Sequence, residues 1–157
     1  MKSNYFKLLV LTGTLVNFIN AQDAQFTATI TNNLPYTIKI NDRKWEGTLV
    51  EIATLQTGQT TNLSDLSTYT QSTSSQSNLI ITKDGTDIAE IILLKQFGYE
   101  NHKPAVIVSL VPFPHWIGGS KFIREELDQD TNVFNVQIDL KQDKEETLEP
   151  TKISVNY

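Results

Sequence analysis

An aromatic loop in the second half of the chain is the first candidate for a binding site. It runs from Pro112 to Gly119 and carries Phe113, His115 and Trp116 between prolines, which stiffen it, and glycines, which loosen it. Aromatic rings at a surface stack on sugars, insert at membrane interfaces or dock into proteins. We therefore expect a ligand-binding tip here, with Trp45 as a second aromatic contact. The alternative is that these rings plug one end of a core.

Oxygen-bearing side chains follow this loop at every second position. They are Asp128, Asp130 and Asn132, and their spacing lets a loop bring oxygens together around a hard cation such as calcium. Val133 stands where an EF-hand loop needs glycine, and Asp139 replaces its bidentate glutamate. The sequence predicts either a calcium site of a different geometry or a solvated acidic turn.

Catalytic groups are sparse along the chain. Its two histidines, His102 and His115, have a spacing that fits no metal-binding motif, and the lack of cysteine excludes thiol catalysis. Gly118 to Phe122 approaches a nucleophile elbow around Ser120, but Phe122 stands where the motif requires glycine. We expect a protein that binds rather than catalyses and has no cofactor other than the possible calcium ion. The alternative enzyme would be a secreted hydrolase that uses His115 with Ser120 or nearby acidic residues.

The first 21 residues have the layout of a secretory signal peptide. Lys2 and Lys7 flank a polar start, an apolar run extends from Leu8 to Val16, and Ala21 precedes the expected cleavage site, with Ala24 as the alternative. The apolar run is much shorter than the about 20 residues of a membrane-spanning helix. The sequence thus predicts a secreted or periplasmic protein whose mature chain begins at residue 22.

The composition of the mature chain limits its partners. Its 136 residues suit one domain, and without the leader's two lysines it has 11 basic and 18 acidic side chains, a formal net charge of −7. Such a chain repels a phosphate backbone, so we expect no nucleic-acid partner. It contains no cysteine, so packing alone must hold the fold together.

Alternation of apolar and polar residues with a period of two recurs along the chain and predicts β-strands. The predicted strands span residues 25–31, 36–40, 48–55, 79–83, 86–94, 104–111, 134–140 and 153–157, with 59–63 as a further short candidate. Asp84-Gly85 supplies the positive φ angles of a two-residue hairpin turn, so the strands on either side of it should pair. The second of these strands is apolar on both faces, which indicates a central strand or one that faces a partner.

Three segments interrupt this alternation. Residues 64–78 are mostly Ser, Thr and Gln with almost nothing to bury, which predicts a long solvated loop. Lys121 to Leu127 tolerates a helix and follows Ser120, a good N-cap, which predicts one short helix over 120–127. The charged residues 141–149 predict a hairpin loop.

Two stretches of the mature chain resemble known secreted proteins. The sequences Asn-Asn-Leu-Pro-Tyr-Thr-Ile-Lys-Ile (32–40) and Gln-Thr-Gly-Gln-Thr-Thr-Asn-Leu (56–63) look like segments of aegerolysins and thaumatin-like proteins. The likeness covers about the first third of the mature chain, which lacks the cysteine framework of thaumatin-like proteins. It implies a secreted single sandwich and transfers no functional residue.

These features together predict an all-β fold. We expect an antiparallel β-sandwich of about 7–8 strands, with the short helix near 120–127, as a single domain over residues 22–157. Its function would be binding, through loops at one end of the sandwich, of a carbohydrate, a membrane surface or a protein partner. The alternating Ile153, Val155 and Tyr157 at the chain end leave open a small outer-membrane β-barrel or a membrane-active sandwich.

Overall fold

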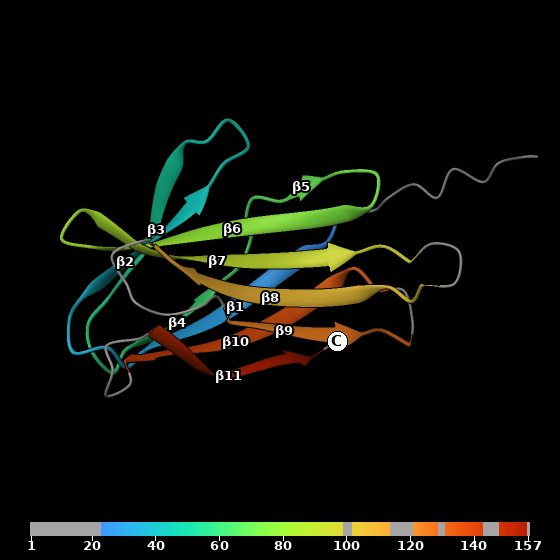
Figure 1. Ribbon diagram of the computed structural model, residues 1–157. Coiled ribbons are helices and arrows are strands. Elements are labelled where there is room, and N and C mark those ends of the chain that lie inside the picture. The colour runs from blue at the N-terminus through green and yellow to red at the C-terminus, as the bar shows by residue number, and fades with distance from the viewer. Residues whose placement is uncertain (1–22, 99–101, 114–120, 129–130, 143–147, 157) are drawn as a thin grey trace, which may run out of the picture.

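The computed structural model describes residues 23–98, 102–113, 121–128, 131–142 and 148–156, which form two β-sheets packed face to face (Figure 1). The predicted leader lies outside these residues. The predicted sandwich is confirmed, although the described residues contain eleven strands rather than seven or eight. They contain no helix with the length and apolar character that crossing a bilayer requires.

The smaller sheet, sheet A, has four strands in the order β11-β10-β1-β4. Their bounds are Gln25–Asn32 for β1, Thr60–Leu63 for β4, Val133–Gln142 for β10 and Leu148–Asn156 for β11. Strands β1 and β10 pair in parallel, which places Phe26 opposite Phe134 with their ring centroids 5.5 Å apart. The sandwich is therefore mixed rather than purely antiparallel, because the first strand of the sheet lies beside β10 and runs in the same direction.

The larger sheet, sheet B, has the strand order β3-β2-β6-β7-β8-β9, and the short strand β5 also pairs with β6. The bounds are Ile38–Arg43 for β2, Leu49–Leu55 for β3, Tyr69–Thr70 for β5, Ser74–Lys83 for β6, Thr86–Gln96 for β7, Ala105–Pro112 for β8 and Lys121–Glu126 for β9. All of these strand pairs are antiparallel. In Figure 1 the strands β5 to β9 follow one another from top to bottom, and β1 and β10 pass behind them.

The core between the sheets is formed by the apolar side chains that alternate with polar ones along the strands, as predicted. Phe26, Ala28 and Ile30 of β1 are buried while the threonines between them are partly exposed, and Ile91 and Leu93 of β7 are buried from the other sheet. Side chains of a strand point alternately to opposite faces, so each sheet has one inner face and one outer face. This division decides which residues of sheet B are accessible to a ligand.

The predicted helix over 120–127 is wrong. Lys121–Glu126 forms strand β9, which pairs with β8 from Ala105↔Glu126 to Leu110↔Lys121. The local preference of these residues for helix is weak, and pairing with the otherwise open edge of β8 outweighs it. Because the segment is a strand, Phe122 lies on one face of sheet B and not on the side of a helix.

The predicted solvated loop over 64–78 is also wrong in its second half. Ser75 and Ser77 belong to β6 and are buried, at 0% and 1% exposure. The Ser75 hydroxyl accepts a hydrogen bond from the Ala24 backbone N–H at 3.1 Å, and the hydroxyls of Ser77 and Thr68 lie 3.1 Å apart. Small hydroxyl side chains can therefore face this core, because their polar atoms find partners inside it.

The turn at Asp84-Gly85 forms as predicted and joins β6 to β7. Asp84 has a φ of 50° and Gly85 a φ of 79°, both in the left-handed region.

We expect Gly85→Val to lower the free energy of unfolding by about 1–2 kcal/mol, because a β-branched residue is strained there. Asp84→Asn is the matched control and should change it little, since asparagine tolerates this region. Urea unfolding of both variants tests this expectation, and an unchanged midpoint for Gly85→Val would contradict it.

Candidate functional site

The structure separates the two aromatic positions that the sequence suggested for binding. The Phe113 backbone N–H donates to the Ile88 carbonyl at 3.1 Å, so Phe113 lies beside the first half of β7. Trp45 lies in a cleft with Gln76, whose partner on β7 is Leu94. Leu94 lies six positions after Ile88 on this strand, a distance of about 20 Å. The other two candidates, at positions 115 and 116, lie outside the described residues.

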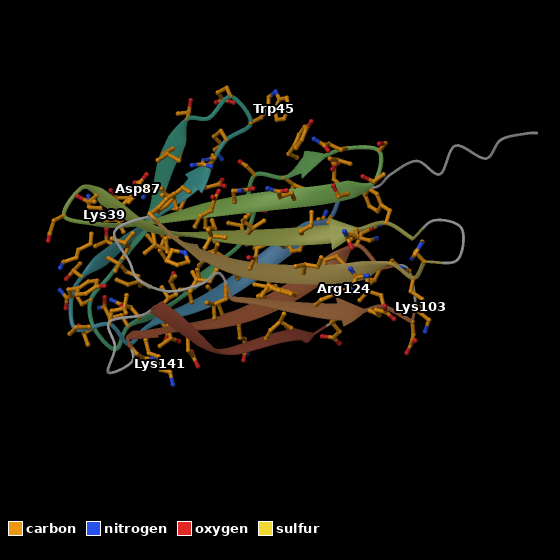
Figure 2. All side chains as sticks on the ribbon, viewed as in Figure 1. Lys39, Trp45, Asp87, Lys103, Arg124 and Lys141 are labelled. Carbon is orange, nitrogen blue, oxygen red and sulfur yellow. The ribbon has the colours of Figure 1, made fainter. Side chains whose placement is uncertain are left out.

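Trp45 is placed by the hairpin between β2 and β3. The turn is closed by hydrogen bonds from Lys44 N to Thr48 O at 2.8 Å and from Gly47 N to Lys44 O at 2.9 Å, and Gly47 has a φ of 86°. A bulge at Ile52 of β3 interrupts the pairing with β2, and bulges bend a strand pair. The hairpin rises from the sheet with Trp45 near its tip (Figures 1 and 2), and the Trp45 side chain is 71% exposed.

A second aromatic ring supports the exposed one. The rings of Trp45 and Tyr69 are stacked, with centroids 3.9 Å apart and an interplanar angle of 24°. Tyr69 comes from β5, which pairs with β6 through Tyr69↔Gln76, and its hydroxyl accepts a hydrogen bond from Gln71 Nε2 at 3.0 Å. One face of the indole is therefore seated on Tyr69, and the large exposed area of Trp45 is available to a ligand.

The stacked rings border a cleft of about 450 Å³. Its remaining lining is polar and comprises Arg43, Lys44, Glu46, Ser67, Thr68, Gln76 and Asn78. Gln76 and Asn78 alternate with the buried Ser75 and Ser77, so they point away from the core. We call this hollow the Trp45 cleft. Such a combination, an aromatic platform beside several hydrogen-bonding groups, suits a ligand that has both an apolar face and many hydroxyl groups.

The basic residues of the Trp45 cleft are already paired. Arg43 Nη1 lies 2.9 Å from Glu90 Oε1, and the same oxygen accepts from Asn78 Nδ2 at 2.6 Å. Lys44 Nζ lies 2.8 Å from Asp42 Oδ2. These pairs hold the polar lining in place and leave no surplus of positive charge in the cleft.

Asp42 fixes the base of the hairpin. It is 1% exposed, and its Oδ2 accepts from Lys44 Nζ and, at 3.1 Å, from the Ser67 backbone N–H. Lys44 Nζ also donates to Ser67 Oγ at 2.6 Å. The segment that leads into β5 is thereby tied to the end of β2, which keeps Tyr69 under Trp45.

The predicted calcium ligands have other partners in this structure. Asn132 Oδ1 accepts a hydrogen bond from Lys95 Nζ, and Asp128 Oδ1 accepts one from Lys103 Nζ at 3.0 Å. This hydrogen bond with Asp128 raises the pKa of Lys103. Asp130 lies outside the described residues, and in the described part of the chain no three His, Asp or Glu side chains gather as a metal site would require.

Sequence reasoning found Trp45 and missed the residues that make it a site. Tyr69, Gln76 and Asn78 all fall in the segment predicted to be a solvated loop. A signal was present, because small Ser75 and Ser77 alternate with larger amides, but serine is rarely taken as a core residue.

Comparison with known proteins adds no functional assignment. No family model, no curated protein and no solved structure matches this chain.

Proposed function

We propose that this chain is an exported, non-catalytic module that binds a saccharide in the Trp45 cleft. The observation that carries the proposal is the Trp45 indole, which is 71% exposed and seated on Tyr69 at 3.9 Å. A pyranose ring has an apolar face of C–H groups and an edge of hydroxyl groups. The first matches an exposed indole, and the second matches the amides and hydroxyls that line the cleft.

The surroundings of Trp45 favour a saccharide over a membrane surface. Rings that insert into a bilayer interface are normally accompanied by other apolar residues and by basic residues that attract anionic lipids. Although β3 of the same hairpin carries exposed Leu49, Val50 and Ile52, the cleft lining beside the stacked rings is polar. Arg43 and Lys44 are paired with carboxylates, and the whole chain is acidic. A charged lipid surface would gain little from this cleft.

Calorimetric titration with soluble saccharides tests the proposal. The probes are cellohexaose, mannohexaose, xylohexaose and laminarihexaose, and we expect at least one to bind. Trp45→Ala should weaken that binding at least tenfold, or about 1.4 kcal/mol, while Trp45→Phe, which keeps a ring, should weaken it less. Because the side chain is largely exposed, the free energy of unfolding should change by about 1 kcal/mol or less. The proposal fails if no probe binds, or if Trp45→Ala binds as well as the natural chain.

A further inference from the structure

The outer face of sheet B continues the Trp45 cleft across the molecule. Residues directly opposite each other on paired strands share a face of the sheet. The cross-strand pairs therefore form one row that crosses β5, β6, β7, β8 and β9, namely Tyr69↔Gln76, Gln76↔Leu94, Leu94↔Ile107 and Ile107↔Arg124. With strands about 4.8 Å apart, the four steps of this row span about 19 Å.

A neighbouring row ends on a second exposed aromatic ring. It runs through Asn78↔Ile92, Ile92↔Ser109 and Ser109↔Phe122. Phe122 is 68% exposed. It lies on β9, at one edge of sheet B, whereas Trp45 lies on the β2–β3 hairpin at the other edge. Ile92 and Ser109 are partly exposed. The outer face thus offers an aromatic ring at each end and a mixed aliphatic and polar floor between them.

A second hollow lies at the far end of the first row. It has a volume of about 260 Å³, and its lining includes Leu94, Gln96, Phe97 and Arg124. Tyr69 and Gln76 line the Trp45 cleft, whereas Leu94 and Arg124, from the same row, line this second hollow. One cross-strand row therefore connects the two hollows along the outer face.

The basic side chains that line the two hollows are paired with carboxylates. The four lysines and arginines that line them each lie within 4.0 Å of a carboxylate oxygen: Arg43 with Glu90, Lys44 with Asp42, Lys103 with Asp128 and Arg124 with Glu126. An anionic ligand would have to compete with these carboxylates in a chain that is already acidic. The face is suited to an uncharged ligand.

We infer that the outer face of sheet B binds an extended, uncharged polysaccharide chain, which runs from Trp45 on the hairpin to Phe122 on β9. This inference rests on the proposed saccharide function and specifies the class of ligand. A chain of linked pyranoses presents the same apolar face repeatedly, so one polymer contacts Trp45, the aliphatic floor and Phe122 together. Contacts of this kind within one ligand make its affinity rise with its length.

The test combines probe length with substitution of Phe122. The disaccharide and hexasaccharide of the cello-, manno-, xylo- and laminari- series are titrated into the full chain. We expect the hexasaccharide of the bound series to bind at least tenfold more tightly than its disaccharide. Phe122→Thr, which keeps a residue suited to a strand, should remove at least fivefold of the hexasaccharide affinity and leave the disaccharide unaffected. Val133→Thr is the matched control, because Val133 is 52% exposed on β10 of the other sheet.

The outcomes separate this inference from the proposed function. If Trp45→Ala abolishes binding and Phe122→Thr changes nothing at either length, the cleft binds a saccharide but the extended face does not, and the inference is overturned. A mannuronate hexasaccharide that binds as tightly as mannohexaose would overturn the requirement for an uncharged chain. Phe122-dependent sedimentation with phosphatidylglycerol vesicles, or a Phe122-dependent dimer in ultracentrifugation, would assign the face to a membrane or to a second copy instead.

Discussion

Asn32→Asp should lower the free energy of unfolding by about 3–5 kcal/mol. Asn32 is 0% exposed, and its Nδ2 donates to the carbonyls of Tyr36 at 2.9 Å and Leu55 at 3.0 Å, while its Oδ1 accepts from the Leu34 N–H at 3.0 Å. Aspartate keeps the acceptor and loses both donors. It leaves two buried carbonyls facing a carboxylate, and each unsatisfied buried group costs about 1–3 kcal/mol.

The neighbouring residue provides the control for this substitution. Asn33 is exposed, so Asn33→Asp makes the same chemical change on the surface and should alter stability by about 0.5 kcal/mol or less. Because burial disfavours the charged form, the deficit of Asn32→Asp should shrink as the pH falls from neutral towards about 4, where the carboxyl group of the unfolded chain also becomes protonated, and change little below that. Urea unfolding at two pH values measures both effects. Equal stability of the two variants at neutral pH would show that the Asn32 contacts do not hold β1, its turn and β3 together.

Lys95→Ala should lower the free energy of unfolding by about 2–5 kcal/mol, the range for truncation of a large buried side chain. Lys95 is 0% exposed and lies at the end of β7, opposite buried Ser75 on one side and buried Val106 on the other. Its ammonium group donates to Asn132 Oδ1 and lies 5.2 Å from the centroid of the Phe97 ring. Alanine removes this contact and leaves a cavity beside β6.

Lys95→Met distinguishes packing from charge. Methionine has a similar length and no charge, so it keeps the packed volume. Asn132 is only half-buried, so water can take the place of the ammonium group at its Oδ1. We therefore expect Lys95→Met to lie within about 1.5 kcal/mol of the natural chain. If it proves as unstable as Lys95→Ala, the ammonium contact and not the packed volume stabilises this end of the sandwich.

The architecture could be predicted from the sequence where side chains alternate between large apolar and polar types. The strand that carries Phe26, Ala28 and Ile30 and the turn at Asp84-Gly85 are such cases, because a period of two and a left-handed dipeptide are local properties. The segment over 121–126 has no such pattern. It forms a strand because it pairs with the edge of β8. That pairing depends on the tertiary structure and not on the local sequence.

The candidate site shows the same limit. Trp45 could be recognised as a large ring in a polar loop, but its partner Tyr69 lies 24 residues further along the chain, in a segment with few apolar residues. Their contact depends on β5 pairing with β6 and on the tie between Asp42 and Ser67. The sequence did not indicate Phe122 for a different reason. Its exposure on the outer face can be inferred only once β9 is known to be a strand.

Saccharide binding at Trp45 can be followed directly through its indole N–H signal by heteronuclear NMR, while the tightest-binding hexasaccharide of the panel is added to the full chain. The signal is identified by its absence from the spectrum of Trp45→Phe. We predict a saturable shift of this signal with the same dissociation constant that calorimetry reports. A Trp45 signal that stays in place while the saccharide binds, or a panel in which no saccharide binds, would contradict a saccharide site at Trp45.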